Sequence, residues 1–531
     1  MRRTAATTFA LALSLASSTA ARAQRRLEPP EVPASAAPAS RPAPVVAPEP
    51  PPPPPEEAPP TPAPPPPTTE AERLDEIDQM VRISARKHEL LEEETAKRKA
   101  EGPLVTADDK GFSIKVPDGA FLLRIRGLLQ GDGRFFVDDD VAEANDTFLV
   151  RRFRPSLDGT LFGFADFRFV PELAGTPQVL DGYVDLRPWP WLRLRVGKFK
   201  APVGLERLQS DADLPIIERA LDQNLSSQRD VGVTLWGDLA GGLFNYTLGI
   251  VNGAADTTSA DTDLNHAKDF VARVFFQPFK TEALRDYGTL GVGFAAQTGN
   301  RKGRLPTAVS GLPIPSTPAQ TGLSPFRTAG QTTFFSYYAP ATDTTGATTT
   351  FAHERATRIN PQLYYYYDNV GLLAEYIRLW QGVQRGAKTT TLVHQAAHVT
   401  VTYTFNGRES FEGVTPLVAF DPAKRAWGAL QLAARWSWIE VDAATLSDPN
   451  VPNTGYADAL RSARSARSFA GGIAWVPRRS LRLSLDFEQT QFRGGAGTAI
   501  VPATPGVPAM PAVVTDRKPE NVFIGRAQVN F

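Results

Sequence analysis

Several features that define common protein classes are missing from this 531-residue chain. It contains no cysteine, which excludes disulfide bonds and redox chemistry at thiols. No apolar run approaches the roughly 20 uninterrupted residues that a membrane-spanning helix requires. The charges balance, with 57 Lys and Arg against 57 Asp and Glu, so the chain has no overall preference for nucleic acid and no such partner is expected. Any electrostatic function must depend on where the charges are placed.

The N-terminus has the pattern of a secretory signal peptide. The chain begins Met-Arg-Arg, residues 9–16 are apolar, and residues 21–23 supply the small side chains that signal peptidase reads. We therefore expect residues 1–23 to be removed, so that the mature chain begins at Gln24. An exported chain without a spanning helix is periplasmic, extracellular or a membrane barrel.

Two segments of different composition follow. Residues 24–69 are dominated by proline, alanine, glutamate and threonine, a composition that favours an extended polyproline spacer and cannot bury a core. They are predicted to form either a disordered linker or a periplasmic tether that contacts the cell wall. Residues 70–101 contain strong helix formers without proline or glycine, and Gly102 and Pro103 end this periplasmic helix.

A heptad pattern runs along the predicted helix. Its seam is formed by Leu74, Ile77, Val81, Ser84, His88, Leu91 and Thr95. Because several of these residues are polar, two alternatives stay open. The helix is either a single solvated helix or a self-associating one, such as a trimeric coiled coil.

From residue 111 to residue 531 the chain alternates between apolar and polar residues in short runs, which predicts an all-β fold. Sixteen strands are expected, at 120–136, 147–158, 160–170, 178–188, 191–199, 229–238, 242–252, 266–279, 287–298, 355–368, 370–381, 390–405, 425–441, 465–477, 480–493 and 518–531. Tight turns follow strands two, four, six, ten and fourteen, whereas odd-numbered strands are followed by longer segments. Short turns on one rim and long loops on the other are typical of a 16-stranded antiparallel transmembrane β-barrel.

The last eleven residues support this fold. Their apolar side chains share one face, formed by Phe523, Gly525, Ala527, Val529 and Phe531, while the other face is mostly polar. Such a strand presents one face to outer-membrane lipid and one to the bore. An even number of strands returns the C-terminus to the side of the N-terminal arm, so both are predicted to be periplasmic.

Arginines are concentrated on the polar faces of the predicted strands. In the first strand, Arg124, Arg126 and Arg134 alternate with apolar residues. An arginine facing lipid near the membrane midplane costs about 2 to 4 kcal/mol, so these side chains are predicted to face the bore. The same test places further arginines there, namely Arg152, Arg154, Arg168, Arg193, Arg195, Arg273, Arg435, Arg482 and Arg526.

This set of arginines outnumbers the wall carboxylates by roughly two to one, so we expect the bore to be positive and to draw anions inward. A guanidinium group stays ionised and offers a planar fork to phosphate or carboxylate. The alternative is that acids pair with the arginines and that the pairs only hold the bore open.

Three motifs resemble the phosphate-selective porin O and P family. They are FLVRRF at 148–153, RVGKFKAPVGLE at 195–206, and IERAL at 217–221 followed by QRDVGV at 228–233. The similarity extends over about residues 111–531. It implies a homotrimer of sixteen-stranded barrels in which a ladder of arginines leads small anions, such as phosphate, to a constriction formed by the third external loop, with no cofactor.

The resemblance also implies that Arg151 and Arg152 are wall arginines above the constriction. Strand alternation lets only one of two successive residues face the bore squarely. Both can do so only at a local bulge or at the rim.

The constriction loop is expected at residues 201–228, with a short helix at 214–221 folded into the bore. Phosphate-selective members of the family bring a lysine to the constriction, but this loop contains none. The candidate site residues here, including the Arg229 that follows, are Glu206, Arg207, Asp211, Asp213, Glu218, Arg219 and Arg229. Because acids outnumber cations within the loop, we expect the narrowest part to be less anion-selective than the wall.

Two further features of the sequence bear on possible sites. The segment 406–424 is long for the short-turn side and resembles a connection found in similar proteins, which makes Lys424 and Arg425 candidates for the periplasmic exit, with simple turn solubility as the alternative. His394 and His398 lie four apart on a strand, about 13 Å between Cα atoms, which is too far for one metal ion. No metal site is therefore expected.

Together these patterns predict a passive, anion-preferring porin of the bacterial outer membrane that carries phosphate and other oxyanions. The main alternative is a general or sugar-conducting porin whose arginines are mostly paired, which the acidic third loop favours. An enzyme is not expected, because no Ser, His and acid set converges. A tether of the envelope with a barrel anchor is the remaining alternative.

Overall fold

The structure is a computed structural model that describes residues 70–531 apart from 109–110, 138–144, 260–262, 264, 306–316, 341–342, 344, 452 and 503–508. The predicted signal peptide (1–23) and proline-rich segment (24–69) lie outside the described residues. No helix within the described residues is both long enough and apolar enough to cross a membrane.

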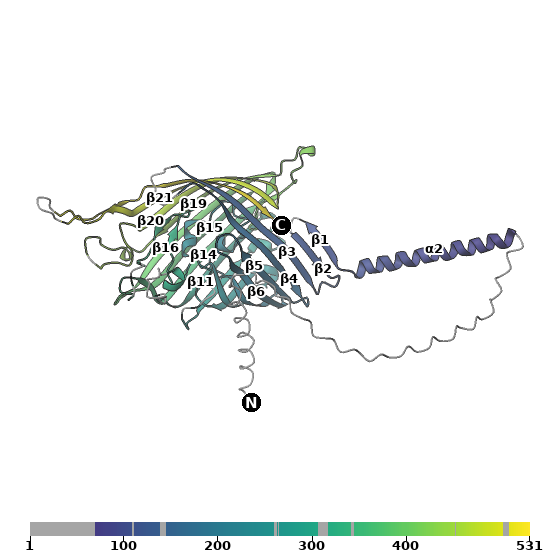
Figure 1. Ribbon diagram of the computed structural model, residues 1–531, viewed down its shortest axis with the longest axis horizontal. Coiled ribbons are helices and arrows are strands. Elements are labelled where there is room, and N and C mark those ends of the chain that lie inside the picture. Colours follow the sequence, from purple (N-terminus) through teal and green to yellow (C-terminus); the bar gives the residue numbers. More distant parts are fainter. Residues whose placement is uncertain are drawn as a thin grey trace, which may run out of the picture. The chain divides into compact units, whose positions relative to one another are not determined.

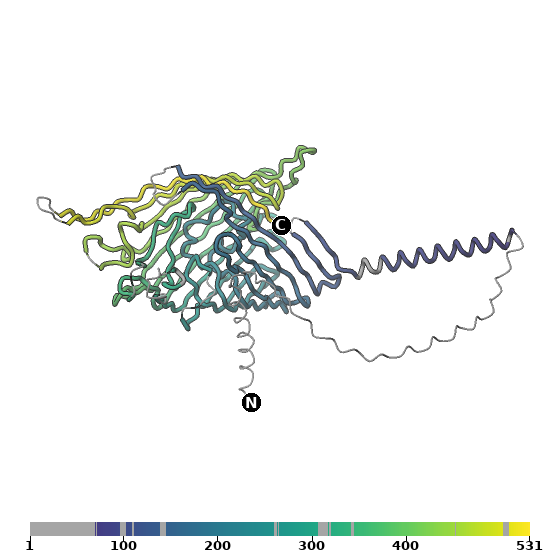
Figure 2. The backbone as a smooth tube through the Cα atoms, in the orientation of Figure 1, coloured from purple at the N-terminus to yellow at the C-terminus, as the bar shows by residue number. Residues whose placement is uncertain are grey.

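Sixteen antiparallel strands form a closed barrel, as predicted, because the last strand pairs with the first (Figure 1). The strands are β3 (Leu122–Phe136), β4 (Thr147–Leu161), β5 (Ala165–Glu172), β6 (Gln178–Trp189), β7 (Leu192–Lys200), β8 (Arg229–Leu239), β9 (Phe244–Val251), β10 (Asp269–Phe276), β11 (Thr289–Lys302), β14 (Thr350–Tyr367), β15 (Val370–Arg385), β16 (Lys388–Phe405), β19 (Ala429–Glu440), β20 (Ala463–Arg478), β21 (Leu481–Thr498) and β23 (Glu520–Asn530). Each pairs with its neighbours in sequence, and the tilted path of the wall can be followed in Figure 2.

Alternation along each strand separates the bore from the lipid-facing surface. In β23, Phe523 and Val529 are 42% and 44% exposed on the outer face, whereas Ile524 and Arg526 are 2% and 6% exposed on the inner face. Arg526 lies opposite Asp132 of β3 in the ladder and donates two hydrogen bonds of 2.7 Å to its carboxylate. The strand that closes the barrel therefore contributes a buried ion pair to the bore.

One connection differs from the predicted alternation of short and long gaps. Strands β15 and β16 reach beyond their predicted ends at residues 381 and 390 and are joined by the two residues 386–387. Gly386 has φ of +55°, a conformation that glycine adopts at little cost in a tight turn. The rim that carries the long loops therefore also carries one short hairpin. We call this rim the long-loop rim and the opposite one the short-turn rim.

Smaller elements surround the barrel strands. A hairpin of β1 (Leu104–Asp108) and β2 (Gly111–Lys115) pairs with β3, and β22 (Val513–Asp516) extends the β21 hairpin. The β1–β2 hairpin was not predicted, because strands of five residues are too short for a clear periodic pattern. The remaining elements are α3 (Leu205–Leu208), η2 (Leu221–Leu225), η3 (Ala240–Gly242), η4 (Pro278–Lys280), η5 (Arg285–Tyr287), α4 (Pro318–Thr321), β12 (Phe326–Arg327), β13 (Thr333–Phe335), β17 (Gly407–Arg408), β18 (Thr415–Pro416), η6 (Pro422–Lys424) and η7 (Ala443–Thr445).

The helix α2 spans Glu70–Glu101. Its seam residues Leu74, Ile77 and Val81 are each more than half exposed in the single chain. An isolated helix with exposed leucine and isoleucine has an unburied apolar stripe, which leaves both the solvated and the self-associating interpretations open.

The bore is filled in part by loops that pack on the inner wall. A cluster of buried apolar side chains joins η2 and the β12–β13 hairpin to the strands β15, β16, β19 and β20, with Leu225, Phe334, Ile377 and Ile439 fully buried. These contacts hold two long loops inside the barrel and leave narrow spaces beside them.

Candidate functional site

The loop between β7 and β8, residues 201–228, lies inside the barrel and is almost wholly buried. The helix expected at 214–221 is absent. The loop instead forms the short helix α3 before this segment and the 3-10 helix η2 at its end. Pro215 interrupts the segment, and the backbone beyond it is used for contacts with the wall, because Ile217 donates its N–H to Asp486 and Arg526 donates to the Ile217 carbonyl oxygen at 2.8 Å.

The start of α3 is bound by a buried carboxylate of the wall. Glu375 accepts the backbone N–H groups of Leu205 and Glu206 at 2.7 and 2.9 Å. Asn360 accepts the N–H of Gly204 at 2.9 Å. Free N–H groups at the start of a helix favour an anionic acceptor, so this acid fixes the loop to β15.

Glu218 joins the middle of the loop to three arginines of the wall. Its carboxylate lies 3.0 Å from Arg134, 2.7 Å from Arg151 and 3.3 Å from Arg526, and its side chain is 5% exposed. A buried carboxylate requires compensation of this kind. The three arginines thus determine where this part of the loop lies.

The paired arginines of β4 both point into the bore because of a bulge. In the β3–β4 ladder Gln130 is opposite Arg152 and Gly131 is opposite Val150, so Arg151 is the extra residue. A bulge puts two successive residues against one partner and breaks the alternation. Arg151 then reaches Glu218, while Arg152 donates to Gln130 at 2.7 Å and lies 3.5 Å from Asp211.

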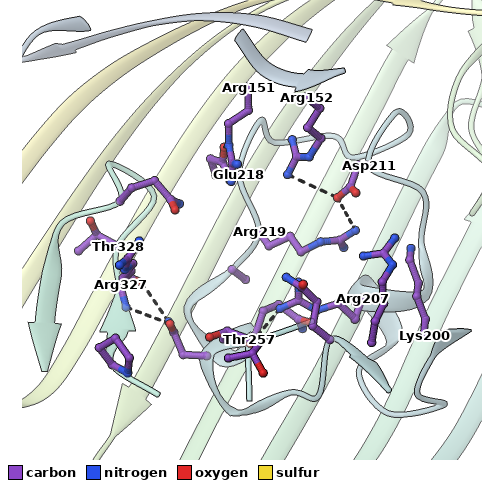
Figure 3. Close-up of a pocket in the computed structure, with 18 of the residues that line it drawn as sticks. Arg151, Arg152, Lys200, Arg207, Asp211, Glu218, Arg219, Thr257, Arg327 and Thr328 are labelled. Carbon is purple, nitrogen blue, oxygen red and sulfur yellow. Dashed lines mark hydrogen bonds and ion pairs between the residues drawn. The ribbon is translucent and has the colours of Figure 1, made fainter. Parts of the chain in front are cut away.

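Asp211 is the second acid around which cations gather. Arg152 and Arg219 lie 3.5 and 2.9 Å from its carboxylate, and Arg154 is in direct contact with it. Figure 3 shows Arg152 and Arg219 converging on Asp211, with Arg151 beside Glu218. Three cations around one carboxylate leave positive charge for another anion in the same space.

A cavity of about 360 Å³ lies on the long-loop side of this cluster. Eight cationic side chains line it against the two carboxylates Asp211 and Glu218; the cations are Arg151, Arg152, Arg154, Lys200, Arg207, Arg219, Arg229 and Arg327. We call it the loop-side cavity. The surplus of six cations makes it an attractive environment for anions.

A second cavity of about 740 Å³ lies toward the short turns. We call it the turn-side cavity. It is lined by eight cations, Arg124, Arg126, Arg154, Arg168, Arg195, Lys200, Arg229 and Arg479, and by four acids, Asp181, Asp211, Asp213 and Glu412, as well as by the C-terminal residue. Its positive surplus is smaller than that of the loop-side cavity.

The two cavities share four lining residues, Arg154, Lys200, Asp211 and Arg229. A residue that lines both spaces lies between them, so these four side chains surround the boundary. Three of the four are cationic. We call this set the junction.

Lys200 is the junction residue that sequence reasoning missed. It is the last residue of β7, one position before the predicted loop, and its Nζ donates to the carbonyl oxygens of Gln209 at 2.8 Å and Leu208 at 3.5 Å. The loop itself contains no lysine, yet Lys200 reaches the constriction from the adjoining strand β7. Lys200 lies in the RVGKFKAPVGLE motif, and its position between the predicted strand 191–199 and the predicted loop is the one signal that the sequence offers.

Two other segments also narrow the bore. The long loop between β11 and β14 lines the loop-side cavity with Arg327 and Thr328. The backbone carbonyl oxygen of Arg327 accepts a hydrogen bond from the side chain of Asn224 at 3.0 Å. On the other side, the carbonyl of Phe411 accepts from Gln209 at 2.9 Å, and Glu412 lines the turn-side cavity. These contacts join residues more than one hundred positions apart, which no local pattern reveals.

Most other predicted wall arginines are paired. Arg126 lies 2.5 Å from Asp158, Arg195 lies 2.6 Å from Asp185, and Arg168 and Arg193 lie 3.8 Å from Asp181 and Asp238. Arg124 is 3.9 Å from Asp158, and Arg229 is 2.9 Å from Asp181.

Like Arg134 and Arg526, the predicted wall arginines Arg435 and Arg482 support the loop and line neither the loop-side nor the turn-side cavity. Arg435 contacts Glu488 at 2.9 Å and Glu206 at 3.5 Å, and Arg482 donates to Gln431 at 2.7 Å and to the Pro215 carbonyl oxygen at 3.2 Å. Most of the predicted wall arginines therefore pair with acids or hold the loop in place.

Lys424 and Arg425, the predicted exit residues, line neither cavity. They lie in and after η6, where Asp421 caps the turn and pairs with Lys424 at 3.2 Å, and the Lys424 side chain is 79% exposed. Phe420 packs on Trp427 and Trp475 on the outer face, which directs this part of the segment away from the bore. Arg479 and Arg124, in contrast, are among the eight cations that line the turn-side cavity.

One group of side chains has ligand types and spacing suited to a metal ion. Single ligand atoms of Glu206, Asp222 and His398 lie within 4.8 Å of one another. His398 already hydrogen-bonds Asp222 at 2.9 Å, and Arg435 pairs with Glu206 at 3.5 Å. These contacts make the group part of the network that binds the loop to the wall. His394 is separate and contacts Tyr337 at 2.7 Å.

No curated protein matches the sequence. Similar solved structures include OmpT of Vibrio cholerae, described as a trimer form (13% identity, 78% of this chain and 100% of that chain, TM-score 0.44), an anion-selective porin from Comamonas acidovorans (11%, 77% and 100%, 0.44) and the outer membrane channel DcaP of Acinetobacter baumannii (10%, 79% and 99%, 0.44).

The sequence itself matches a protein family over most of the barrel. The match covers residues 124–308 and 336–493, more than half of the chain, and the family is described as phosphate-selective porin O and P. The chain therefore belongs to the phosphate-selective porin O and P family, and it is an outer-membrane porin and not an enzyme.

Proposed function

We propose that the protein is a passive channel that prefers small anions, with phosphate and related oxyanions as its permeants. Anions would enter the loop-side cavity, pass the junction and leave through the turn-side cavity. The observation that carries this proposal is the composition of the shared boundary, where three cations, Arg154, Lys200 and Arg229, and one acid, Asp211, line both cavities. In a low-dielectric tube, such a ring attracts anions and repels cations.

The chemistry of the lining also suits oxyanions. Guanidinium groups can bind phosphate oxygens in pairs, and the loop-side cavity presents several of them around one space. Each acid of the junction region is shared by several arginines, so an entering anion competes for hydrogen bonds that already exist. Exchange of this kind keeps binding weak enough for the ion to leave, which conduction requires.

Lys200→Gln tests the proposal most directly. We expect a severalfold fall in the anion-to-cation permeability ratio, measured as the reversal potential in a planar bilayer under a salt gradient, because the junction loses one of its three cations. Lys424→Gln is the matched control, since its side chain is exposed and lines neither cavity. A cation-selective or unselective wild-type channel would overturn the proposal.

Phosphate preference needs a separate measurement. Addition of phosphate to chloride solutions should reduce the chloride current in the wild type, and this block should weaken in Lys200→Gln. If phosphate has no effect at millimolar concentration while the channel remains anion-selective, the permeant class is wider than phosphate.

A general or sugar-conducting porin is the second candidate. It is favoured by the pairing of most wall arginines with acids and by aromatic side chains in the bore, where Arg195 lies over the rings of Tyr183 and Trp236 at 4.5 and 5.1 Å. Titration of the ionic current with neutral oligosaccharides discriminates the two, because a sugar channel is blocked by them and an anion channel is not.

We further propose that the long-loop rim faces the exterior and that both termini and the short turns are periplasmic. The channel would assemble as a homotrimer in outer-membrane lipid, with the N-terminal arm reaching toward the cell wall. The short turns at Asp368 and Pro190 and the long segments on the opposite rim support this orientation. Exposed apolar residues on α2 supply a surface through which three chains could associate.

A further inference from the structure

The outer surface of the barrel carries basic residues at one level near the long-loop rim. Arg301 of β11 points into the bore and pairs with Asp269 at 3.0 Å, so its neighbour Lys302 faces outward and is exposed. Lys302 is opposite His353 in the β11–β14 ladder, and the outward residue Arg355 is opposite Asn300. These side chains cannot contribute to the permeation path, because they lie on the other face of the wall.

The position of these residues along the strand matches the edge of the apolar band. Val292 and Phe294 are 45% exposed on the outer face of β11 and mark the lipid-facing part. Further along, Thr357 of β14 lies opposite Trp380 of β15, and tryptophan is enriched at membrane interfaces. Arg355 and Lys302 follow beyond this level, where lipid head groups begin.

A cavity of about 540 Å³ lies beside these residues. Lys302, Arg304 and His353 line it together with the apolar side chains of Leu305 and Phe351, and no carboxylate is among the described residues that line it. Among the ion pairs of the described residues, His353 lies 3.5 Å from Glu354, whose side chain is 78% exposed. Asp343 does not line the cavity, and its carboxylate accepts the backbone N–H groups of Gly346 and Thr348 at 2.8 and 2.9 Å. None of the ion pairs among the described residues involves Lys302, Arg304 or Arg355.

We propose that this cavity binds a phosphate group of a phosphorylated glycolipid of the outer leaflet. Basic side chains without acid partners match the phosphate, and the adjacent leucine and phenylalanine match the apolar part of the lipid. Attraction to an anionic membrane surface increases with each such cation. The inference depends on the orientation stated in the proposed function, in which this rim lies in the outer leaflet.

The double variant Lys302→Gln/Arg304→Gln tests the site in the full-length purified protein. Binding of fluorescent, bisphosphorylated lipid A is measured in detergent for the wild type, the double variant and Arg461→Gln. Arg461 is an arginine of the same rim whose side chain is 86% exposed and which does not line the cavity. We expect the double variant to lose affinity on the order of tenfold or more, with little change in the control.

Three further measurements discriminate the lipid from other ligands. Dephosphorylated lipid A should bind weakly, inorganic phosphate at millimolar concentration should not displace the lipid, and bilayer conductance of the double variant should equal that of the wild type. Equal binding of both lipid forms, displacement by inorganic phosphate, or unchanged affinity in the double variant would each overturn the proposal. If the wild-type protein binds lipid A but its channel is not anion-selective, the proposed permeants are wrong and the proposed lipid site is still supported.

Discussion

The net charge at the constriction depends on how many arginines share each buried carboxylate. Arg151 and Arg152 have neighbouring positions, but the bulge gives them different acids, Glu218 and Asp211. Arg154 and Arg219 share Asp211 with Arg152. The number of charged residues in the sequence therefore says little about the electric field at the constriction. The ion pairs show that the arginines around Asp211 and Glu218 outnumber these two carboxylates.

Asp213 gives the turn-side cavity a pH dependence. Burial raises the pKa of Asp213 to about 6, although Arg479 and Arg482 oppose the shift. The carboxyl group loses its negative charge as the pH falls through this value, so the cavity becomes more positive below pH 6. We expect the anion-to-cation permeability ratio to rise when the pH is lowered from about 7.5 to about 5, as measured by the reversal potential.

Asp213→Asn provides the comparison for this prediction. The variant should show the higher, low-pH permeability ratio both at about pH 7.5 and at about pH 5. Its permeability ratio should therefore not change near pH 6. A wild-type ratio that stays constant across the range, or a transition that persists in the variant, would assign the pH response to other groups.

At the scale of elements, the third loop is a part of the wall rather than a free segment. Its helix start is bound to Glu375 of β15, its middle to arginines of β3, β4 and β23 through Glu218, and its end to β16 through Asp222 and His398. Anchors on strands around the barrel fix the loop in one position. A fixed loop is needed if a few side chains are to determine which ions pass.

Glu218→Gln should loosen this loop. Loss of the carboxylate leaves Arg134, Arg151 and Arg526 without a shared partner in a buried setting, a change that costs about 3 to 5 kcal/mol in comparable cases. We expect larger open-channel current noise and a changed single-channel conductance in planar bilayers. Glu282→Gln, at an exposed residue of the β10–β11 turn, is the control and should behave as the wild type.

At the scale of the whole molecule, the two rims differ in the length of their connections. Lys302 and Arg355 lie on the outer face near the long-loop rim, whereas the short-turn rim carries the C-terminus and the short turns. The absence of cysteine makes the orientation directly measurable, because any introduced thiol is unique.

Single-cysteine variants test this orientation in intact cells. Ala387→Cys lies in the exposed hairpin turn between β15 and β16, and Ala423→Cys lies in the exposed turn η6 on the other rim. A membrane-impermeant maleimide should label only the first from outside and both after the outer membrane is permeabilised. Labelling of Ala423→Cys alone in intact cells would reverse the proposed orientation.

The barrel could be predicted from local patterns in the sequence. Strand number, the direction each side chain faces and the arginine content of the inner wall all follow from a local period of two residues and from the cost of placing charge in lipid. The closing strand and the inward direction of Arg526 were predictable for this reason. The same period showed that Arg151 and Arg152 can both face the bore only at a bulge or at the rim. The short hairpin at residues 386–387 and the small strands β1 and β2 were missed because their patterns are brief.

The contacts that shape the narrow part of the bore follow from the tertiary structure, although the sequence had placed the constriction loop at residues 201–228. Lys200 reaches the junction only because the loop folds back over the end of its own strand, and Arg327 and Glu412 reach the cavities from loops more than one hundred residues away. The bulge that admits Arg151 depends on the register of β3 against β4. The local pattern of apolar and polar residues carries no information about such contacts. The hydrogen bonds and ion pairs that stabilise them join segments that meet only when the barrel closes.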